Sequence, residues 1–394
     1  MNTDDDHYRS SIFLASESMF PELFEPCSKK IDLGALGEKE YFDKKLGIIG
    51  NSDNIDILGL PTEKLNSFKL AEFGENISCE EVNREIAAAV KCSQIQMGKK
   101  LAGVLGPSDI YIDPFSETSF TELISAYDEQ VNGLEEYVDL FIINNVSSMS
   151  DMRAALLSCK KTEKPVFVII SPTDTDSEEA GGISALGALV TAQEMGADAF
   201  GISCGNYESA SEYLEAVKEL LLYTKIHIIA DLKQKSINTK SFQTSKYIKY
   251  ISVDNDSLTV SKKLTRIDDE LSEIKRHDDF FVFTYYAYTF FLEADTTEIS
   301  EPIICLPDME EIISEICKTS CDVLRVEINS NDDAIDFARN AHMTSRPVMF
   351  LSEDPLALKM ALMLYQGIAL IDSDTMIPKE ELDEMCAKYG AVVY

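Results

Sequence analysis

One cysteine stands where a strand is expected to end. Cys204 closes the apolar run Ala197–Cys204, whose last four residues read Gly201-Ile202-Ser203-Cys204. A thiolate is a nucleophile and a ligand for zinc, and α/β barrels place their chemistry at the carboxyl ends of the strands. The sequence therefore predicts that Cys204 lies at the functional end of the fold.

Three more polar residues follow strand-like runs. Glu17 comes after the first run, Asn144 ends the run from Val138, and Asp254 ends the run from Tyr250. Carboxylates at strand ends can hold substrates, protons or cations. We expect these residues and Cys204 to surround one barrel mouth. They could also catalyse a different reaction there, one other than metal-assisted group transfer.

The elements that would position these residues alternate between strand and helix. Glu80–Gly98 and Ser119–Tyr137 repeat apolar residues at about 3.6, which is typical of helices packed on a sheet. Eight βα units in about 270 residues predict a (β/α)8 TIM barrel over residues 1–278, and an open doubly wound sheet is the alternative. The predicted strands are Ile12–Ala15, Ile55–Leu60, Leu101–Leu105, Val138–Asn144, Val166–Ser171, Ala197–Cys204, Ile226–Leu232 and Tyr250–Asp254.

Residues 279–394 predict a second, smaller α/β domain. The run Phe280–Leu292 is densely aromatic, and at a period of two both of its faces are apolar, which predicts a single strand buried on both faces. We expect four or five parallel strands after it, too few for a second barrel, docked on the first barrel or on a second copy. The runs are Ile303–Leu306, Val323–Ile328, Pro347–Leu351, Ile368–Asp372 and Ala391–Tyr394.

Composition limits the partners. The chain has 394 residues and a formal net charge of −34 at pH 7. Such a charge repels phosphate backbones and anionic lipids, so we expect no nucleic acid and no membrane partner, while a protein partner with a basic surface stays open. Nine cysteines do not suggest a disulfide framework, and no secretory signal is evident, so we expect reduced thiols and a cytoplasmic location.

Several motifs over residues 12–260 resemble the homocysteine S-methyltransferase family, the N-terminal barrel of cobalamin-dependent methionine synthases. The resemblance implies a TIM barrel, methyl transfer to a thiol in methionine biosynthesis, and a zinc ion held by cysteines, of which Cys204 matches one. The motifs that carry it are FKLAEFG at Phe68–Gly74, LAGVLGPS at Leu101–Ser108, AYDEQVNGL at Ala126–Leu134, and Gly201–Cys204.

The active-site motifs depart from the family pattern. The family's D-G-A-M-G-T is Ser16–Pro21 here, its T-N-T-F is Leu60–Glu63, and its cysteine pair after the last strand aligns with Asp254-Asn255. A catalytic zinc needs three protein ligands, and this chain offers Cys204 and at best Asp254. We therefore expect zinc to be absent or substoichiometric. The substrate positions that the resemblance implies are Ser16, Glu17, Thr62, Gly106 and Asn144.

The C-terminal part has a fainter likeness to the pterin-binding barrel of the same enzymes, over Ser352–Ser373 and Ala387–Tyr394. About half of such a barrel is present, so we expect neither folate nor a corrinoid on this chain. Two interpretations stay open. The first is a methyltransferase-like protein acting on a small thiol or amino acid. The second is a non-catalytic barrel serving as a binding module, which the altered zinc motif favours.

Overall fold

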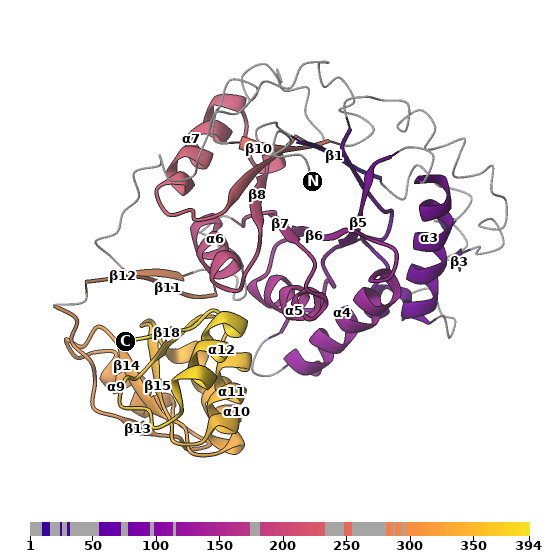
Figure 1. Cartoon of the computed structure of the whole chain (residues 1–394). Coiled ribbons are helices and arrows are strands. Elements are labelled where there is room, and N and C mark those ends of the chain that lie inside the picture. The colour runs from indigo at the N-terminus through magenta and orange to yellow at the C-terminus, as the bar shows by residue number, and fades with distance from the viewer. Residues whose placement is uncertain are drawn as a thin grey trace.

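The computed structural model contains a closed barrel and a second parallel sheet, which lie side by side (Figure 1). Among the described residues, no helix is long and apolar enough to cross a bilayer. The structure describes residues 10–15, 24–25, 30–31, 55–71, 78–94, 98–112, 116–173, 182–232, 248–253, 281–286, 288–293 and 296–394.

Eight parallel strands close the barrel in the order β1-β10-β9-β8-β7-β6-β5-β4. Strand β1 pairs with both β4 and β10, so no edge is left open. Each of the eight predicted runs overlaps one of these strands. The prediction of a TIM barrel is confirmed, and the open sheet is excluded. The strands are β1 (Ser10–Leu14), β4 (Ile57–Gly59), β5 (Lys100–Leu105), β6 (Leu140–Val146), β7 (Val166–Ile170), β8 (Ala199–Ser203), β9 (His227–Asp231) and β10 (Ile248–Val253).

Helices cover the outside of the barrel (Figure 1). Four of them start at a serine whose side chain accepts a hydrogen bond from a backbone N–H of the first turn, which satisfies a donor that the helix itself cannot. The four serines are Ser119, Ser148, Ser184 and Ser209. The helices are α2 (Ser67–Ala71), α3 (Cys79–Gln94), α4 (Phe120–Leu134), α5 (Met149–Cys159), α6 (Ala185–Glu194) and α7 (Ala210–Leu221), with short 3-10 turns η4 (Lys160–Thr162) and η5 (Cys204–Asn206).

The barrel strands separate two apolar layers. Inside the barrel lies one cluster, which includes Ile142, Ala199 and Ile229. The neighbouring residues Phe200 and Ile228 belong instead to the outer layer, between strands and helices. Because successive strand residues face opposite sides, membership of these clusters shows which residues at each strand end face the interior.

The second sheet has five parallel strands in sequential order, β13-β14-β15-β17-β18. This confirms the prediction of a small parallel α/β unit. Alternate residues again face two sides, with Phe350 towards the helices and Met349 towards the other face. The elements are β13 (Ile303–Ile304), α9 (Glu310–Ile316), β14 (Leu324–Glu327), α10 (Asn331–Asn340), η8 (Ala341–Met343), β15 (Val348–Leu351), α11 (Pro355–Leu364), β17 (Leu370–Ile371), α12 (Lys379–Tyr389) and β18 (Val392–Val393).

The aromatic run before this sheet is a hairpin, so the prediction of one strand buried on both faces is wrong. Strands β11 (Phe281–Tyr285) and β12 (Tyr288–Leu292) pair antiparallel, and β11 also pairs antiparallel with β16 (Gly367–Ile368). The turn contains Tyr286 at a φ of 48°. A run of thirteen residues exceeds the usual strand length, and folding back lets β11 bury aromatic rings while β12 stays at an edge.

The hairpin fills the space between the two units. Phe283 and Leu292 pack with Met349 and Leu370 of the second sheet and with Val190 of barrel helix α6. The second sheet therefore docks on the barrel, as one of the two predicted arrangements had it. The boundary predicted between residues 278 and 279 lies outside the described residues.

A single buried arginine reinforces this docking. Arg153 of helix α5 is fully buried and donates hydrogen bonds to the carbonyl oxygens of Gly367 (2.7 Å), Leu362 (2.9 Å) and Tyr389 (3.0 Å). Leu362 lies in the last turn of α11, and Tyr389 ends α12. The guanidinium of the barrel thus caps the negative ends of two helices in the neighbouring unit.

Candidate barrel-mouth site

Polar side chains line the inner wall where three neighbouring barrel strands end. Ser203 of β8 is aligned with Asp231 of β9, which is aligned with Ser252 of β10. Ala199 and Ile229 face the interior. Side chains an even number of residues apart share a face of a strand, so Ser203, four residues after Ala199, and Asp231, two residues after Ile229, also face inward. They lie at the carboxyl ends of the strands, where barrel enzymes have their active sites.

This polar layer is mostly shielded from solvent. Asp231 and Ser252 are fully buried, whereas Ser203 is partly exposed. In the part of the chain that the structure describes, the Ser252 hydroxyl makes no hydrogen bond. A buried hydroxyl beside a buried carboxylate favours a polar ligand over an apolar one.

Asn144 joins this layer from β6. It is buried, and it faces inward because Ile142, two residues earlier, belongs to the interior cluster. The strand bulges directly after it, with Asn145 at a φ of 59°. Bulges beside barrel mouths redirect side chains, and asparagine tolerates this left-handed conformation better than most residues. The structure thus places Asn144 at the predicted mouth, and its role towards a substrate stays a prediction.

Cys204 faces the other way. Its fully buried side chain belongs to the outer layer, one residue after the inward-facing Ser203, and it begins the short turn η5. Nearby, the Tyr213 hydroxyl donates to the carbonyl oxygen of Ile202 (2.9 Å) and accepts from the backbone N–H of Asp231 (3.3 Å). Cys204 is therefore at the predicted end of its strand but behind the wall of the barrel.

This arrangement does not fit the zinc ion that the family resemblance implies. Within the described ranges, no three His, Cys, Asp or Glu side chains gather as metal ligands. Cys204 points into an apolar layer, so its thiol does not share the space that Asn144 and Asp231 face. Three other predicted positions, Ser16, Glu17 and Asp254, lie outside the described residues.

Thr62 and Gly106 support the mouth rather than face it. The fully buried Thr62 hydroxyl donates to the carbonyl oxygen of Val104 (2.8 Å) and accepts from its N–H (3.2 Å), which ties the end of β4 to β5. A Cβ atom at Gly106 would lie 2.5 Å from the carbonyl oxygen of Glu63, so only glycine permits this close approach. Whether either residue also contacts a substrate stays a prediction.

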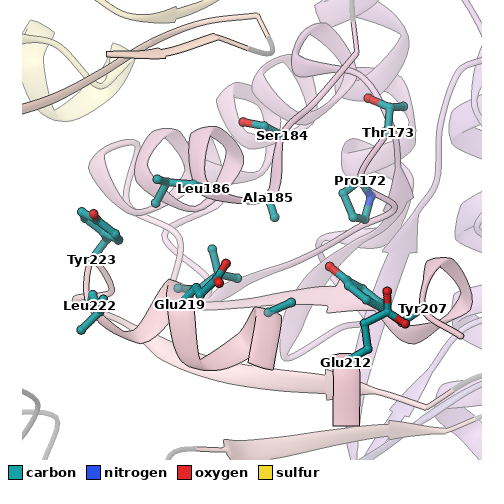
Figure 2. Close-up of a pocket in the computed structure, with 12 residues that line it drawn as sticks. Pro172, Thr173, Ser184, Ala185, Leu186, Tyr207, Glu212, Glu219, Leu222 and Tyr223 are labelled. Atoms are coloured by element: carbon teal, nitrogen blue, oxygen red, sulfur yellow. The ribbon is translucent and has the colours of Figure 1, made fainter. Parts of the chain in front are cut away.

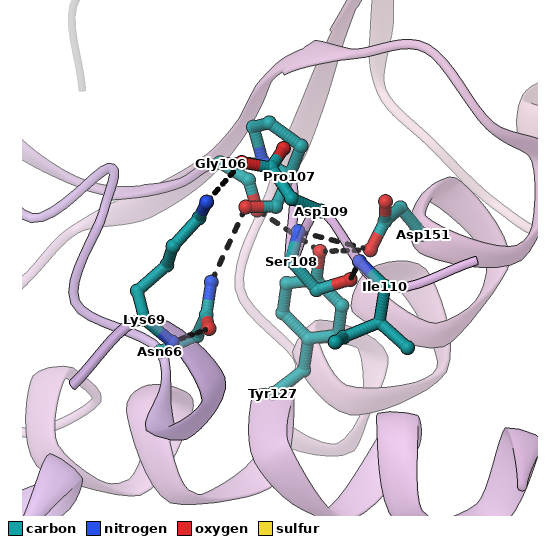
Figure 3. A network of polar contacts seen from close by, with 9 residues as sticks. All are labelled: Asn66, Lys69, Gly106, Pro107, Ser108, Asp109, Ile110, Tyr127 and Asp151. Carbon is teal, nitrogen blue, oxygen red and sulfur yellow. Dashed lines mark hydrogen bonds and ion pairs between the residues drawn. The ribbon is translucent and has the colours of Figure 1, made fainter. Parts of the chain in front are cut away.

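A buried network holds the loop after β5 (Figure 3). The carboxylate of Asp151 accepts hydrogen bonds from the Tyr127 hydroxyl (2.7 Å) and the Ser108 N–H (3.2 Å) through one oxygen, and from the Ser148 hydroxyl (3.1 Å) through the other. Burial raises the pKa of Asp151, and these hydrogen bonds oppose that rise. Burial also raises the pKa of Tyr127, and the neighbouring Asp151 raises it further.

The other side of the same loop is held from helix α2. The Asn66 side chain donates to the carbonyl oxygen of Pro107 (3.3 Å), and Lys69 forms an ion pair with Asp109 (Figure 3). The loop that contains Gly106 and Pro107 is thus held by residues of three helices, α2, α4 and α5, at the rim of the barrel mouth. Asp151 was not among the predicted site residues, although the spacing of Ser148 and Asp151 is that of a helix cap.

Asp231, Ser203 and Ser252 were also missed as functional residues. The available signal was the two-residue period of each strand, because counting back from the apolar core positions separates Ser203 from Cys204. Together these side chains offer one carboxylate, two hydroxyls and the Asn144 amide. Such a set can bind the ammonium and carboxylate groups of a small amino acid.

Comparison with known proteins identifies the family. Residues 61–261, just over half of the chain, match the model of the homocysteine S-methyltransferase family. No curated protein matches the sequence. Similar solved structures include the homocysteine methyltransferase MmuM from Escherichia coli in its metallated form, with 12% identity, 64% of this chain and 94% of that chain covered, and a TM-score of 0.49.

The apo form of the same enzyme has 11% identity, covers 64% of this chain and 92% of its own, and has a TM-score of 0.46. A type I 3-dehydroquinate dehydratase from Clostridium difficile has 14% identity, with 68% and 90% covered and a TM-score of 0.38. The match to the family model is the finding that assigns the family. This chain belongs to the homocysteine S-methyltransferase family.

Proposed function

We propose that the barrel mouth binds a small amino acid or thiol and that the protein takes part in methyl transfer to sulfur, without a resident zinc ion. The polar layer of Ser203, Asp231 and Ser252, turned inward at three neighbouring strand ends, carries the proposal. The family supplies the class of reaction. Because the chain lacks the cysteine pair that the resemblance implies as zinc ligands, we expect it to differ from zinc-dependent relatives in holding no zinc ion.

The residues of the layer divide the work of binding. A carboxylate in a shielded site attracts an ammonium group more strongly than it would in water, so Asp231 would hold the amino group of the ligand. The Ser203 hydroxyl and the Asn144 amide can donate to its carboxylate. The loop fixed by Asp151 would keep the rim in place, so that little ordering is needed on binding.

The sulfur would depend on its own acidity. An unperturbed thiol has a pKa near 8.5, so only a few per cent is thiolate at pH 7. A bound zinc ion would raise the thiolate fraction by lowering the pKa of the substrate thiol, but a catalytic zinc ion needs three protein ligands. The packing of Cys204 in the outer layer removes one of them from the mouth. We therefore expect turnover to be slow and to rise with pH as the free thiol ionises.

Calorimetric titration with L-homocysteine tests the binding step. We expect binding by the wild type, and a loss of affinity of about tenfold or more in Asp231→Asn, because a charge-assisted hydrogen bond becomes a neutral one. Asp332→Asn makes the same chemical change at an exposed position of α10 and should leave the affinity unchanged. Equal affinity in Asp231→Asn and wild type would contradict the proposed site.

Metal analysis tests the zinc part. Protein purified without chelator should hold zinc well below one ion per chain, with no change in Cys204→Ala. One zinc per chain that disappears in Cys204→Ala would overturn the zinc-free reading. The outward-facing Cys204 favours a second candidate, a barrel that binds its ligand without transferring a methyl group. Binding of homocysteine with no methyl transfer from any sulfonium donor would select that candidate.

A further inference from the structure

A cavity of about 620 Å³ lies outside the barrel, between helices α6 and α7 (Figure 2). Pro172 and Tyr207 line one end of it, directly after strands β7 and β8. Leu222 and Tyr223 line the other end, beyond the end of α7. The cavity is therefore a groove that starts at the rim of the mouth and follows the two helices, separate from the site proposed above.

One wall of the groove is acidic. Glu212 and Glu219 line it from the same face of α7, seven residues or about 10 Å apart. Burial raises the pKa of Tyr207, and these two carboxylates raise it further, so their charges act on the groove. The cations nearest in sequence are engaged elsewhere, since Lys218 pairs with Glu215 and Lys225 pairs with Glu194, each at 2.6 Å.

The far end of the groove is apolar and continues onto the hairpin. The ring of Tyr223 lies 5.9 Å from the ring of Phe291 in β12, and Leu222 beside it is exposed. Phe291 is 44% exposed and lies on the face of β12 that is turned to α6, since Thr289, two residues earlier, contacts Ser184. In the three-stranded sheet β12-β11-β16, β12 is an outer strand. Exposed apolar side chains gathered in this way are typical of protein contact surfaces.

We propose that this groove binds a basic, amphipathic segment of another protein. The two glutamates would pair with lysine or arginine residues two helical turns apart, and Leu222 and Phe291 would receive the apolar face of the segment. A small amine would use the acidic wall alone. The continuation of the groove onto the exposed ring of Phe291 in β12 favours a polypeptide, and the net charge of −34 would speed its approach.

The test uses fluorescence anisotropy with the full chain and a labelled leucine-lysine peptide of about four helical turns, patterned as an amphipathic helix. A lysine-glycine peptide of equal charge is the comparison. We expect the amphipathic peptide to bind at least about tenfold more tightly. Its affinity should fall about fivefold or more in Glu212→Gln/Glu219→Gln and in Leu222→Ser/Phe291→Ser.

The matched control is Glu135→Gln/Glu136→Gln, at exposed positions after α4, which removes the same charge and should change the affinity less than about twofold. Hydrogen exchange should slow in α7 and β12 when the peptide binds, which locates it even if a variant folds poorly. Equal losses in both glutamine pairs would reduce the effect to net charge and overturn the proposal. Full displacement of the peptide by spermine, or no protection in β12, would also overturn it.

Discussion

The barrel and the second sheet are built from the same kind of parallel βα repeat, yet they end differently. Eight repeats close, and polar residues such as Asn144 and Asp231 face an enclosed space. Five repeats stay open, and the face that would have been an interior is covered by the rings of the β11–β12 hairpin. The difference shows that closure of the sheet, rather than the repeat itself, encloses the polar strand ends.

Arg153→Met should have the largest effect, because it removes the hydrogen bonds that join the barrel to the second unit. The methionine keeps much of the volume but leaves three backbone carbonyl oxygens, two of them at helix ends, without their donor. We expect a loss of about 3–5 kcal/mol in the free energy of unfolding, measured by denaturant titration. Arg84→Met, at an exposed ion pair on α3, should cost less than about 1 kcal/mol. Similar costs for both would deny Arg153 its docking role.

Gly106→Ala should disturb the barrel mouth and leave the second sheet intact. The new Cβ would meet backbone atoms of Glu63, which cannot move aside as a side chain can, so we expect a cost of about 1–3 kcal/mol. Gly205→Ala is the matched control, since the nearest atom to its Cβ would be 3.6 Å away. Thermal unfolding of both variants measures the difference, and equal transition temperatures would contradict the close approach.

Asp151→Asn should change how stability depends on pH. The pKa of Asp151 in the folded chain is raised above its unfolded value of about 3.9, so the folded state binds this proton more tightly. Its contribution to stability is thus largest below pH 3.9 and declines as the pH rises through the folded pKa. Unfolding between about pH 4 and pH 8 should show a smaller decline in Asp151→Asn than in wild type. Parallel curves would refute the assignment.

The thiols should differ little between the two units. Burial raises the pKa of Cys79, in the barrel, and of Cys305, in the second unit, each to about 12. Burial also raises the pKa of Cys159 above its usual value. Because the thiolate is the reactive form, these three should label slowly with a disulfide reagent at pH 8 and quickly in denaturant. Rapid native labelling of Cys79, mapped by mass spectrometry, would contradict its burial.

Much of the fold could be predicted because periodicity is local. The eight barrel strands and the five of the second sheet coincide with apolar runs, and capping serines mark the helix starts. The hairpin could not be predicted in the same way. Aromatic and other apolar residues occupy both faces of both strands, so periodicity gave no sign of the turn near Tyr286.

The site was harder to predict than the fold. The end of a strand can be found from composition, but a shift of one residue reverses which side chains face the barrel interior. That one residue is the difference between the inward-facing Ser203 and the outward-facing Cys204. Asp231 lies inside the predicted run Ile226–Leu232, so nothing in the sequence indicated that this residue closes the strand. Arg153 could not be predicted at all, because its three acceptors lie more than 200 residues away and come together only in the tertiary structure.

The arginine between the two units also has a consequence for how the chain is made. The ribosome releases the barrel first, and at that stage Arg153 can still be hydrated. Its water is removed only when α11 and α12 have been synthesised and bring their carbonyl oxygens. Docking should therefore be a late step of folding. A barrel made without the second unit would expose an apolar surface with Arg153 at its centre, and such a surface favours chaperone binding or aggregation.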